Sequence, residues 1–274
     1  MTPSAIRVVP LPRFAQGGRW RTEAMRSYSQ PVLIWFTKGQ GRITVAGSTR
    51  GFGPHNAVFL PAGTMHGFEM SGQVFGSLVY FPRDFSADLP SDPQHLRFRD
   101  AHEQAELTQL IDNLQREAER EMPGHDRALM AHGGLLVVWL ERQMAARSDA
   151  ELRPDKARQL TAAFTALVER DFRSGKLVHD YAAELGVTPT HLSRVCNASC
   201  GRPASAILAD RVHYEARRLL SETRTPVKDI ARDLFVALCA FDIASTPLPL
   251  FGTEMWCPST GAFVISGHEC DIAT

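Results

Sequence analysis

The feature that most constrains the fold is the run LVHDYAAELGVTPTHLSRVCN, residues 177–197. It places Ala182 four positions before Gly186, and Leu192 and Val195 six and nine positions after that glycine. A small alanine lets two helices cross closely, a glycine accommodates a left-handed turn, and the two aliphatic side chains pack the second helix on the first. The spacing therefore predicts a helix-turn-helix over residues 178–197.

The second of these helices has a recognisable start and a polar outer side. Thr188 is expected to cap it and Pro189 to occupy its first turn, where a missing N–H costs nothing. The outer side carries the kind of hydrogen-bonding groups that read base edges in the major groove, although an ordinary polar surface is the alternative. Arg194 is the best candidate for a guanine or phosphate contact. We predict DNA contacts from Thr188, Thr190, His191, Ser193, Arg194 and Asn197.

Charge divides the chain, which at 274 residues is long enough for two domains, into three parts. Residues 1–154 carry 17 basic and 16 acidic side chains, residues 155–234 carry 13 and 10, and residues 235–274 carry none and 4. The middle part is therefore +3 and the last part −4, although the formal net charge of the whole chain is zero. A mildly basic middle part points to an anionic partner.

The first 85 residues alternate short apolar runs with glycine-containing turns, and apolar residues at helical spacing are absent there. Strands this short and this regularly punctuated are typical of an antiparallel barrel or sandwich. The expected strands cover residues 32–36, 42–45, 57–60 and 74–81. With the helical segments that follow, they predict an α+β fold class.

Two helices are expected after the strands. Residues 101–121 place aliphatic side chains at helical spacing between charges, and Pro123 and Gly124 end that helix. A second helix follows, with Asp126 as its expected N-cap. The pair either closes the barrel or offers one face for a dimer, and the two roles are compatible. Residues 148–155 are polar, include a proline, and predict a linker.

The segment PAGTMH, residues 61–66, resembles the second conserved motif of cupins. Pro61 fixes one turn dihedral, Gly63 allows a positive φ, and His66 is then expected to face the barrel interior. His55 and His66 are too few for a metal site, because borderline metals usually take three or four ligands, and no histidine precedes His55. We therefore expect no metal and no cofactor.

The domain order and the motif AAELGVTPTHLSRV together are similar to the AraC family of bacterial transcription regulators. The stretch GRPASAILADRVHYEARRLLSETRTPVKDIARDL resembles the family's connecting helix and the start of a second helix-turn-helix. The resemblance implies a transcription regulator that binds double-stranded DNA at a promoter, responds to a small effector and forms a homodimer. The expected effector contacts are Trp35, His55, His66 and Tyr80.

The resemblance also implies a division of the chain. The expected parts are a cupin-like effector-binding barrel (1–100), a dimerising helical pair (101–147), a linker (148–155), a DNA-binding domain (156–234) and an aberrant tail (235–274). Within the DNA-binding domain we expect the first helix-turn-helix at 178–197, the connecting helix at 203–221 and the start of the second motif at 226–234.

The resemblance to the family ends after Leu234. Thr225 matches the family's cap and Ala231 its close-contact residue, but the turn glycine should fall at position 235, where this chain has Phe235. No lysine or arginine follows, and a segment without positive charge cannot gain affinity from counterion release. We expect an irregular tail and impaired DNA binding. A shifted reading frame, a replaced C-terminus or a divergent tail would each explain the break.

The alternative function is a cupin-type small-molecule-binding protein or metal-dependent enzyme with an incidental helical C-terminus. No Ser-His-Asp, phosphate-cradling or paired-carboxylate pattern stands out, so we expect no enzyme. Apolar runs long enough to span a membrane and a signal-peptide pattern are absent, which predicts a cytoplasmic protein without membrane contact. Five cysteines, an odd number, indicate reduced thiols rather than a disulfide framework.

Overall fold

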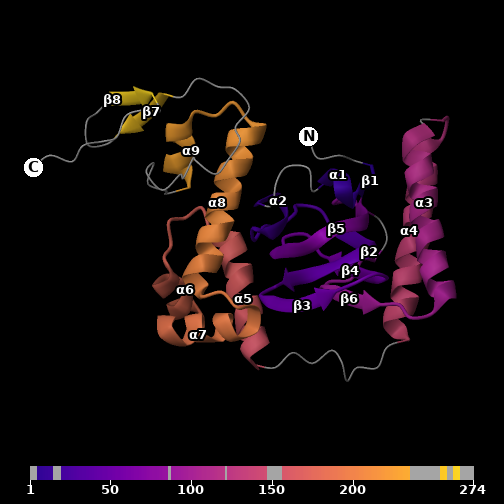
Figure 1. The fold of residues 1–274 in the computed structure, drawn as a ribbon, viewed down its shortest axis with the longest axis horizontal. Helices are drawn as coiled ribbons and strands as arrows, with labels where there is room; N and C mark the ends of the chain where they lie inside the picture. The colour runs from indigo at the N-terminus through magenta and orange to yellow at the C-terminus, as the bar shows by residue number, and fades with distance from the viewer. Residues whose placement is uncertain are drawn as a thin grey trace, which may run out of the picture.

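The computed structural model describes residues 5–14, 20–85, 88–120, 122–146, 156–234, 254–257 and 262–265. Within them a β-sheet domain lies in the middle, with a helical pair on one side and a helix-turn-helix domain on the other (Figure 1). An antiparallel sheet followed by a helical region confirms the expected α+β fold class.

The sheet domain contains six antiparallel strands in the order β1-β5-β2-β4-β6, with β3 paired to β2. It also contains two short helices, α1 (Leu11–Phe14) and α2 (Trp20–Glu23). The strands are β1 (Arg7–Pro10), β2 (Val32–Val45), β3 (Ser48–Phe52), β4 (Asn56–Leu60), β5 (His66–Tyr80) and β6 (Gln94–Arg97).

Two long strands replace the short ones that the glycines led us to expect. β2 runs for 14 residues and β5 for 15, and they pair along most of their length. Their register shifts between Phe36 and Gln40, where Gly39 has a φ of 92°, so the ladder bends instead of ending. No ladder joins the edge strands β1 and β6 in the described part of the chain, so the barrel is a rolled sheet rather than a closed one.

Alternate residues of β2 serve two different cores. Ile34 and Phe36 pack inside the roll, where the rings of Phe36 and Phe52 stack with centroids 4.0 Å apart. Leu33 and Trp35 point to the other face, which the helical pair covers. The alternation therefore both fills the roll and attaches the helices.

The helical pair consists of α3 (Ala101–Arg120) and α4 (His125–Ala145), as expected. Trp35 Nε1 donates a hydrogen bond to Thr108 Oγ1 at 3.3 Å, which ties α3 to the sheet. The expected N-cap of α4 is wrong: the cap is Gly124, and Asp126 lies within the first turn. The reason is the φ of 83° at Gly124, which turns the chain into the helix two residues early.

The helix-turn-helix domain contains five helices in the described part of the chain. These are α5 (Lys156–Asp171), α6 (Val178–Glu184), α7 (Pro189–Cys200), α8 (Ala204–Glu222) and α9 (Val227–Asp233). The expected cap of α9 at Thr225 is also wrong, because the cap is Pro226 and has no side-chain hydrogen bond. Thr225 instead hydrogen-bonds to Thr223, and the fixed φ of Pro226 sets the entry into the helix.

Two short strands, β7 (Glu254–Cys257) and β8 (Ala262–Ile265), form an antiparallel pair in the tail. The expectation of an irregular tail is therefore wrong for these eight residues, whose two apolar runs flank the turn-forming sequence PSTG. The rest of the tail and the expected linker at 148–155 lie outside the described residues.

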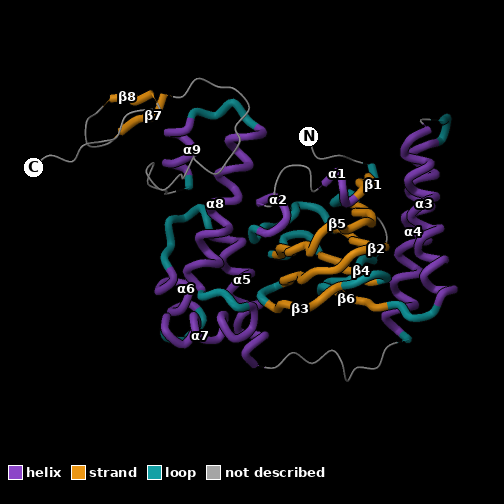
Figure 2. Tube along the Cα trace, viewed as in Figure 1, coloured by secondary structure: helices purple, strands orange, loops and turns teal. Residues whose placement is uncertain are grey.

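The turn between β2 and β3 meets the helix-turn-helix domain, and Figure 2 shows the helices of that domain beside β3. Ala46 and Gly47 both have positive φ, 45° and 71°, as in the hairpin turn that matches the strand twist. A Cβ added at Gly47 would lie 2.1 Å from Cγ2 of Thr161 on α5. The missing side chain at this turn therefore lets the two domains approach closely.

The bend of β5 gives a stability prediction. Gly76 has a φ of 151°, and an added Cβ would lie 1.9 Å from the carbonyl oxygen of Trp35. Gly76→Ala should therefore lower the free energy of unfolding by at least about 3 kcal/mol, because backbone strain and a backbone clash add. Urea denaturation measures this. Gly63→Ala is the control, since its φ is 77° but nothing lies within 4 Å of the added Cβ, and it should cost about 1 kcal/mol. Equal losses of unfolding free energy in the two variants would show that the clash at Gly76 does not contribute.

Candidate nucleic-acid interface

The turn between α6 and α7 has the geometry that the spacing predicted. Ala182 and Leu192 are both 0% exposed and belong to one core with Phe164 and Tyr181. Gly186 has a φ of 68°, the left-handed conformation expected of the turn. Burial of these small and aliphatic side chains fixes α7 on the helices beneath it.

The start of α7 is also as predicted. Thr188 is the N-cap, and its hydroxyl oxygen accepts a hydrogen bond from the backbone N–H of His191 at 3.2 Å. Pro189 occupies the first turn. The remaining N–H groups at this end, together with the helix dipole, form a site that favours anions.

The six side chains predicted to contact DNA all reach the surface of α7 or its cap. Nη2 of Arg194 lies 3.1 Å from Nδ1 of His191, so the imidazole steadies the guanidinium while other N–H donors stay available. The sheet domain also contacts α7 through β3. Exposed are Thr188, Thr190, Arg194 and Asn197, and half-buried are His191 and Ser193.

Two basic side chains beside the motif are engaged by carboxylates. Arg170 donates to Asp171 and Glu184, and Lys176 donates to the same two residues. These hydrogen bonds hold the pKa of Asp171 and of Glu184 below the usual range and raise the pKa of Lys176. The four groups tie the end of α5 to α6, whereas Arg194 on α7 has no carboxylate partner among the described residues.

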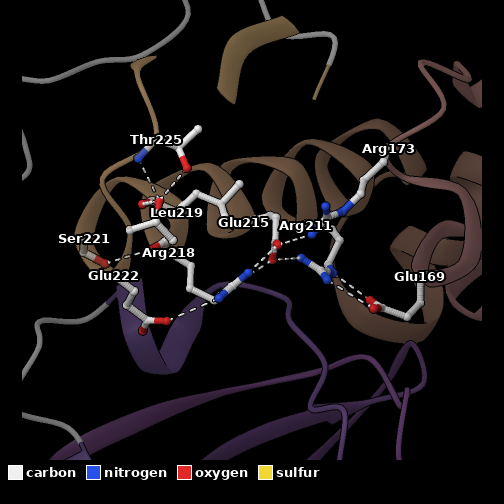
Figure 3. A network of polar contacts seen from close by, with 10 residues as sticks. Glu169, Arg173, Arg211, Glu215, Arg218, Leu219, Ser221, Glu222 and Thr225 are labelled. Carbon is white, nitrogen blue, oxygen red and sulfur yellow. Dashed lines mark hydrogen bonds and ion pairs between the residues drawn. The ribbon is translucent and has the colours of Figure 1, made fainter. Parts of the chain in front are cut away.

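A buried ion network holds α8 against α5 (Figure 3). Arg211 is 5% exposed, and its guanidinium donates to both carboxylate oxygens of Glu169, at 2.6 and 3.1 Å. Glu215, 3% exposed, accepts from Arg211 at 3.3 Å and also from Arg173 and Arg218. Burial raises the pKa of Glu215, but Arg218, Arg211 and Arg173 outweigh it and leave the pKa below the usual range.

The two cysteines of α7 are packing groups. Cys196 and Cys200 are 0% and 9% exposed, and burial raises the pKa of the Cys196 thiol to about 12. A thiol with so high a pKa is a weak nucleophile, so these residues act as small apolar side chains in the core.

The structure does not bring the four expected effector contacts into one site. Trp35 and His55 lie with ring centroids 5.8 Å apart, and Trp35 faces the helical pair. His66 packs instead on Tyr28 at 4.7 Å, and Tyr28 packs on Tyr80 at 5.3 Å. His66 and Tyr80 are 0% and 8% exposed, and burial raises the pKa of Tyr80. Contact of each with an effector stays a prediction.

Two residues beside His66 were missed by the sequence reasoning. Arg26 is 0% exposed, and its Nε donates to the hydroxyl of Tyr28 at 3.2 Å. Both residues precede the first long strand in the segment AMRSYSQP, where no motif or spacing indicates a site. Only the fold brings them to His66, through backbone hydrogen bonds between residues 40 positions apart.

No three histidine, cysteine, aspartate or glutamate side chains gather within the described ranges in a way that could hold a metal ion. Among the same residues, none of the helices is both long and apolar enough to cross a membrane.

Comparisons with known proteins assign both halves of the chain. A model of the AraC-like ligand binding domain matches residues 13–137, and a model of a helix-turn-helix domain matches residues 181–235. Among solved structures, ToxT from Vibrio cholerae O395 is 13% identical, covers 85% of this chain and 88% of its own, and has a TM-score of 0.39. The AraC-like transcriptional activator CuxR is 15% identical, covers 79% and 76%, and has a TM-score of 0.37. The search of curated proteins finds no match.

The ion network gives a pH-dependent prediction. Glu215→Gln should lower the free energy of unfolding at pH 7 by about 3 kcal/mol, because three arginines lose a buried carboxylate. Since the folded pKa of Glu215 lies below its unfolded value, its stabilisation is present above a pH of about 4.3 and is lost as the pH falls through the folded pKa. Urea denaturation from pH 3 to 7 should show a shallower acid loss in the variant.

The control for this prediction is Glu222→Gln on the same helix. Glu222 pairs with Arg218 at 3.3 Å but its side chain is 45% exposed, so the change should cost less than about 1 kcal/mol. Equal losses and equal pH profiles in the two variants would show that Glu215 does not stabilise α8.

Proposed function

Because the chain belongs to the AraC family of transcription regulators, we propose that it binds double-stranded DNA by placing α7 in the major groove. The observation that carries the proposal is the open, polar outer face of a capped helix whose opposite face is buried. The proposed contacts are Thr188, Thr190, His191, Ser193, Arg194 and Asn197. An α-helix fits the major groove, and each of these side chains can donate or accept there.

The roles of these contacts differ. Thr188 and the free N–H groups at the start of α7 suit a phosphate, which positions the helix without reading sequence. Arg194 suits a guanine, whose two acceptors match a guanidinium, or a second phosphate. Thr190, Ser193 and Asn197 carry short hydrogen-bonding groups that suit base edges further along the groove.

We propose that the affinity of this chain for DNA is low. α9 is the proposed start of a second motif, but Phe235 stands where the turn glycine is expected, and no basic residue follows. With one recognition helix per chain, about half of the roughly 4–10 kcal/mol that separates specific from non-specific binding is lost.

A homodimer through the helical pair would recover part of this affinity. Leu135 and Val138 are three residues apart on α4, and they are 57% and 40% exposed. Two large apolar side chains on one exposed helical face support a contact with a second copy. Joining two copies of α7 raises the effective concentration of the second at its half-site.

The remaining part of the proposal concerns regulation. The sheet domain would bind a small effector and act on DNA binding in the cytoplasm without catalysing a reaction. The match of residues 13–137 to a ligand-binding domain supports this role, and Trp35, His55, His66 and Tyr80 are its proposed contacts.

Arg194→Ala tests the DNA contact. A duplex selected from a randomised pool by the full chain serves as probe, and fluorescence anisotropy measures the dissociation constant. The variant should lose about 1–3 kcal/mol of binding free energy. Arg116→Ala, which removes one exposed arginine from α3, is the matched control and should bind unchanged. Equal effects of the two substitutions would contradict the proposal, since only bulk charge would then matter.

The same titration tests the low affinity. At physiological salt we expect a micromolar dissociation constant for the selected duplex, close to the range of non-specific binding. A nanomolar constant that a scrambled duplex does not reproduce would show that one recognition helix per chain is sufficient and would overturn this part of the proposal.

A further inference from the structure

Arg26 is a buried cation without a carboxylate partner among the described residues. Its side chain is 0% exposed, and Nη1 donates to the carbonyl oxygens of Thr22 and Ala24, at 2.8 and 3.2 Å. Nε donates to the hydroxyl of Tyr28. Nη2 is buried and has no hydrogen-bond partner within the described part of the chain. A buried guanidinium usually has an anion beside it, because an unpaired charge is costly to remove from water.

Aromatic rings surround this guanidinium. Its carbon lies 4.9 Å from the ring centroid of Phe68, 5.3 Å from that of Phe14 and 5.6 Å from that of Tyr28. A fourth ring, Tyr214 of α8, lies 5.9 Å away. Cation–π contacts offset part of the cost of burial, but they do not give Nη2 an acceptor.

His66 supplies a second unsatisfied nitrogen at the same place. It exchanges two backbone hydrogen bonds with Arg26, at 2.9 and 2.7 Å, so the two residues are fixed as neighbours. Its Nδ1 lies 2.9 Å from the carbonyl oxygen of Thr64, and because a carbonyl only accepts, Nδ1 carries the proton. Nε2 then presents a lone pair, and it is buried with no hydrogen-bond partner among the residues that the structure describes.

We propose that Arg26 and His66 bind the carboxylate of a small organic acid, taken up together with one proton. The carboxylate accepts a hydrogen bond from Nη2 of Arg26. Nε2 of His66 takes up a proton from solvent, and the resulting N–H donates a hydrogen bond to the same carboxylate. The complex then contains two cations and one anion in place of one unpaired cation. The rings within 6 Å of the guanidinium limit the ligand to small acids unless side chains move.

Electrostatics explain why the proton comes with the anion. Burial, together with the charge of Arg26, lowers the pKa of His66 to about 3. The groups that act on it are Arg26 and Tyr28 before β2 and Arg211 on α8, while Tyr80 on β5 packs behind Tyr28. Burial raises the pKa of Tyr80 and Arg211 is paired with glutamates, so Arg26 is the charge that an anion would compensate. A carboxylate beside His66 therefore raises its pKa.

The site lies where the sheet domain meets the helix-turn-helix domain. Met25 and Met65, each adjacent in sequence to one of the two residues, belong to the core of the helix-turn-helix domain. Tyr214 of α8 contacts Trp20 of α2, with ring centroids 5.7 Å apart, as well as Arg26. Occupancy of the site would therefore change the surroundings of α8, the helix that follows α7. The inference deepens the proposed function, since it names the class of effector and rests on that function for its regulatory meaning.

Isothermal titration of the full chain with formate, in the absence of DNA, tests the site directly. Two buffers of different ionisation heat give the number of protons taken up. We expect saturable binding with uptake of up to one proton, and an affinity that rises by up to about ten-fold per pH unit as the pH falls from 7.5 to 5.5. Sodium chloride at equal ionic strength should not reproduce the binding. Chloride binding of equal strength, or no formate binding at either pH, would overturn the proposal.

Two variants separate the roles of the residues. Arg26→Gln should weaken formate binding at least ten-fold, while Arg50→Gln, an exposed arginine on β3, should not change it. His66→Gln should retain binding but lose the proton uptake, because an amide donates without titrating. Should Arg26→Gln fail to fold, the number of protons taken up by the unaltered chain and by His66→Gln still tests the site. Proton uptake that persists in His66→Gln would contradict the assignment.

The imidazole signal of His66 in NMR gives an independent readout. Its pKa should rise from about 3 to above about 5.5 when formate is added, because proton uptake between pH 5.5 and 7.5 requires a protonated imidazole in the complex. An unchanged pKa with bound formate would place the ligand elsewhere. These measurements contain no DNA, so their failure leaves the DNA-binding proposal intact. A separate anisotropy titration with and without formate, at equal ionic strength, then reports whether the site acts on DNA binding.

Discussion

The buried pairing of Arg211 with Glu169 and Glu215 determines how the helix-turn-helix domain is held together. It joins α5 to α8, and α8 follows the capped helix whose outer face is the proposed DNA contact. Each member would be costly to bury alone, so the network is stable only while all its partners are present. The orientation of α7 therefore depends on charges more than ten residues away in sequence, as well as on the apolar core beneath it.

At the β2–β3 hairpin, the close approach of the two domains depends on one small residue. Gly47 at the tip of the β2–β3 hairpin lets Thr161 of α5 come within van der Waals distance of the turn. The ion pairs that cross the junction are long and partly exposed, at 3.8 Å for Arg21 with Glu222. Such pairs contribute little energy. The junction is thus sterically well fitted but weakly held by charge, which would suit the proposed regulation by an effector.

Local rules predicted the parts of the fold that local chemistry controls. The cap at Thr188, the turn at Gly186 and the buried face of α7 follow from residue types at fixed spacing, and the structure confirms them. The length of β2 was not predictable in this way, because Gly39 reads as a turn but forms a bulge within a paired strand. The pairing of Arg26 with His66 could not be predicted either, since only two long-range backbone hydrogen bonds bring these residues together.

The buried arginines Arg211 and Arg26 lie at the same junction but differ in whether a carboxylate pairs with them, and this difference gives each a different role. Arg211 has two carboxylates, so a new anion beside it would compete with bonds that already exist and gain little. Arg26 has carbonyl, hydroxyl and ring partners but no described carboxylate, so an anion there meets an unsatisfied donor in a region of low dielectric. The ring of Tyr214, on α8, lies against Arg26, and Arg211 fixes α8 in place. A charge change at Arg26 therefore acts on a helix that the ion pairs of Arg211 keep rigid. A rigid α8 would carry that change toward α7 rather than absorb it.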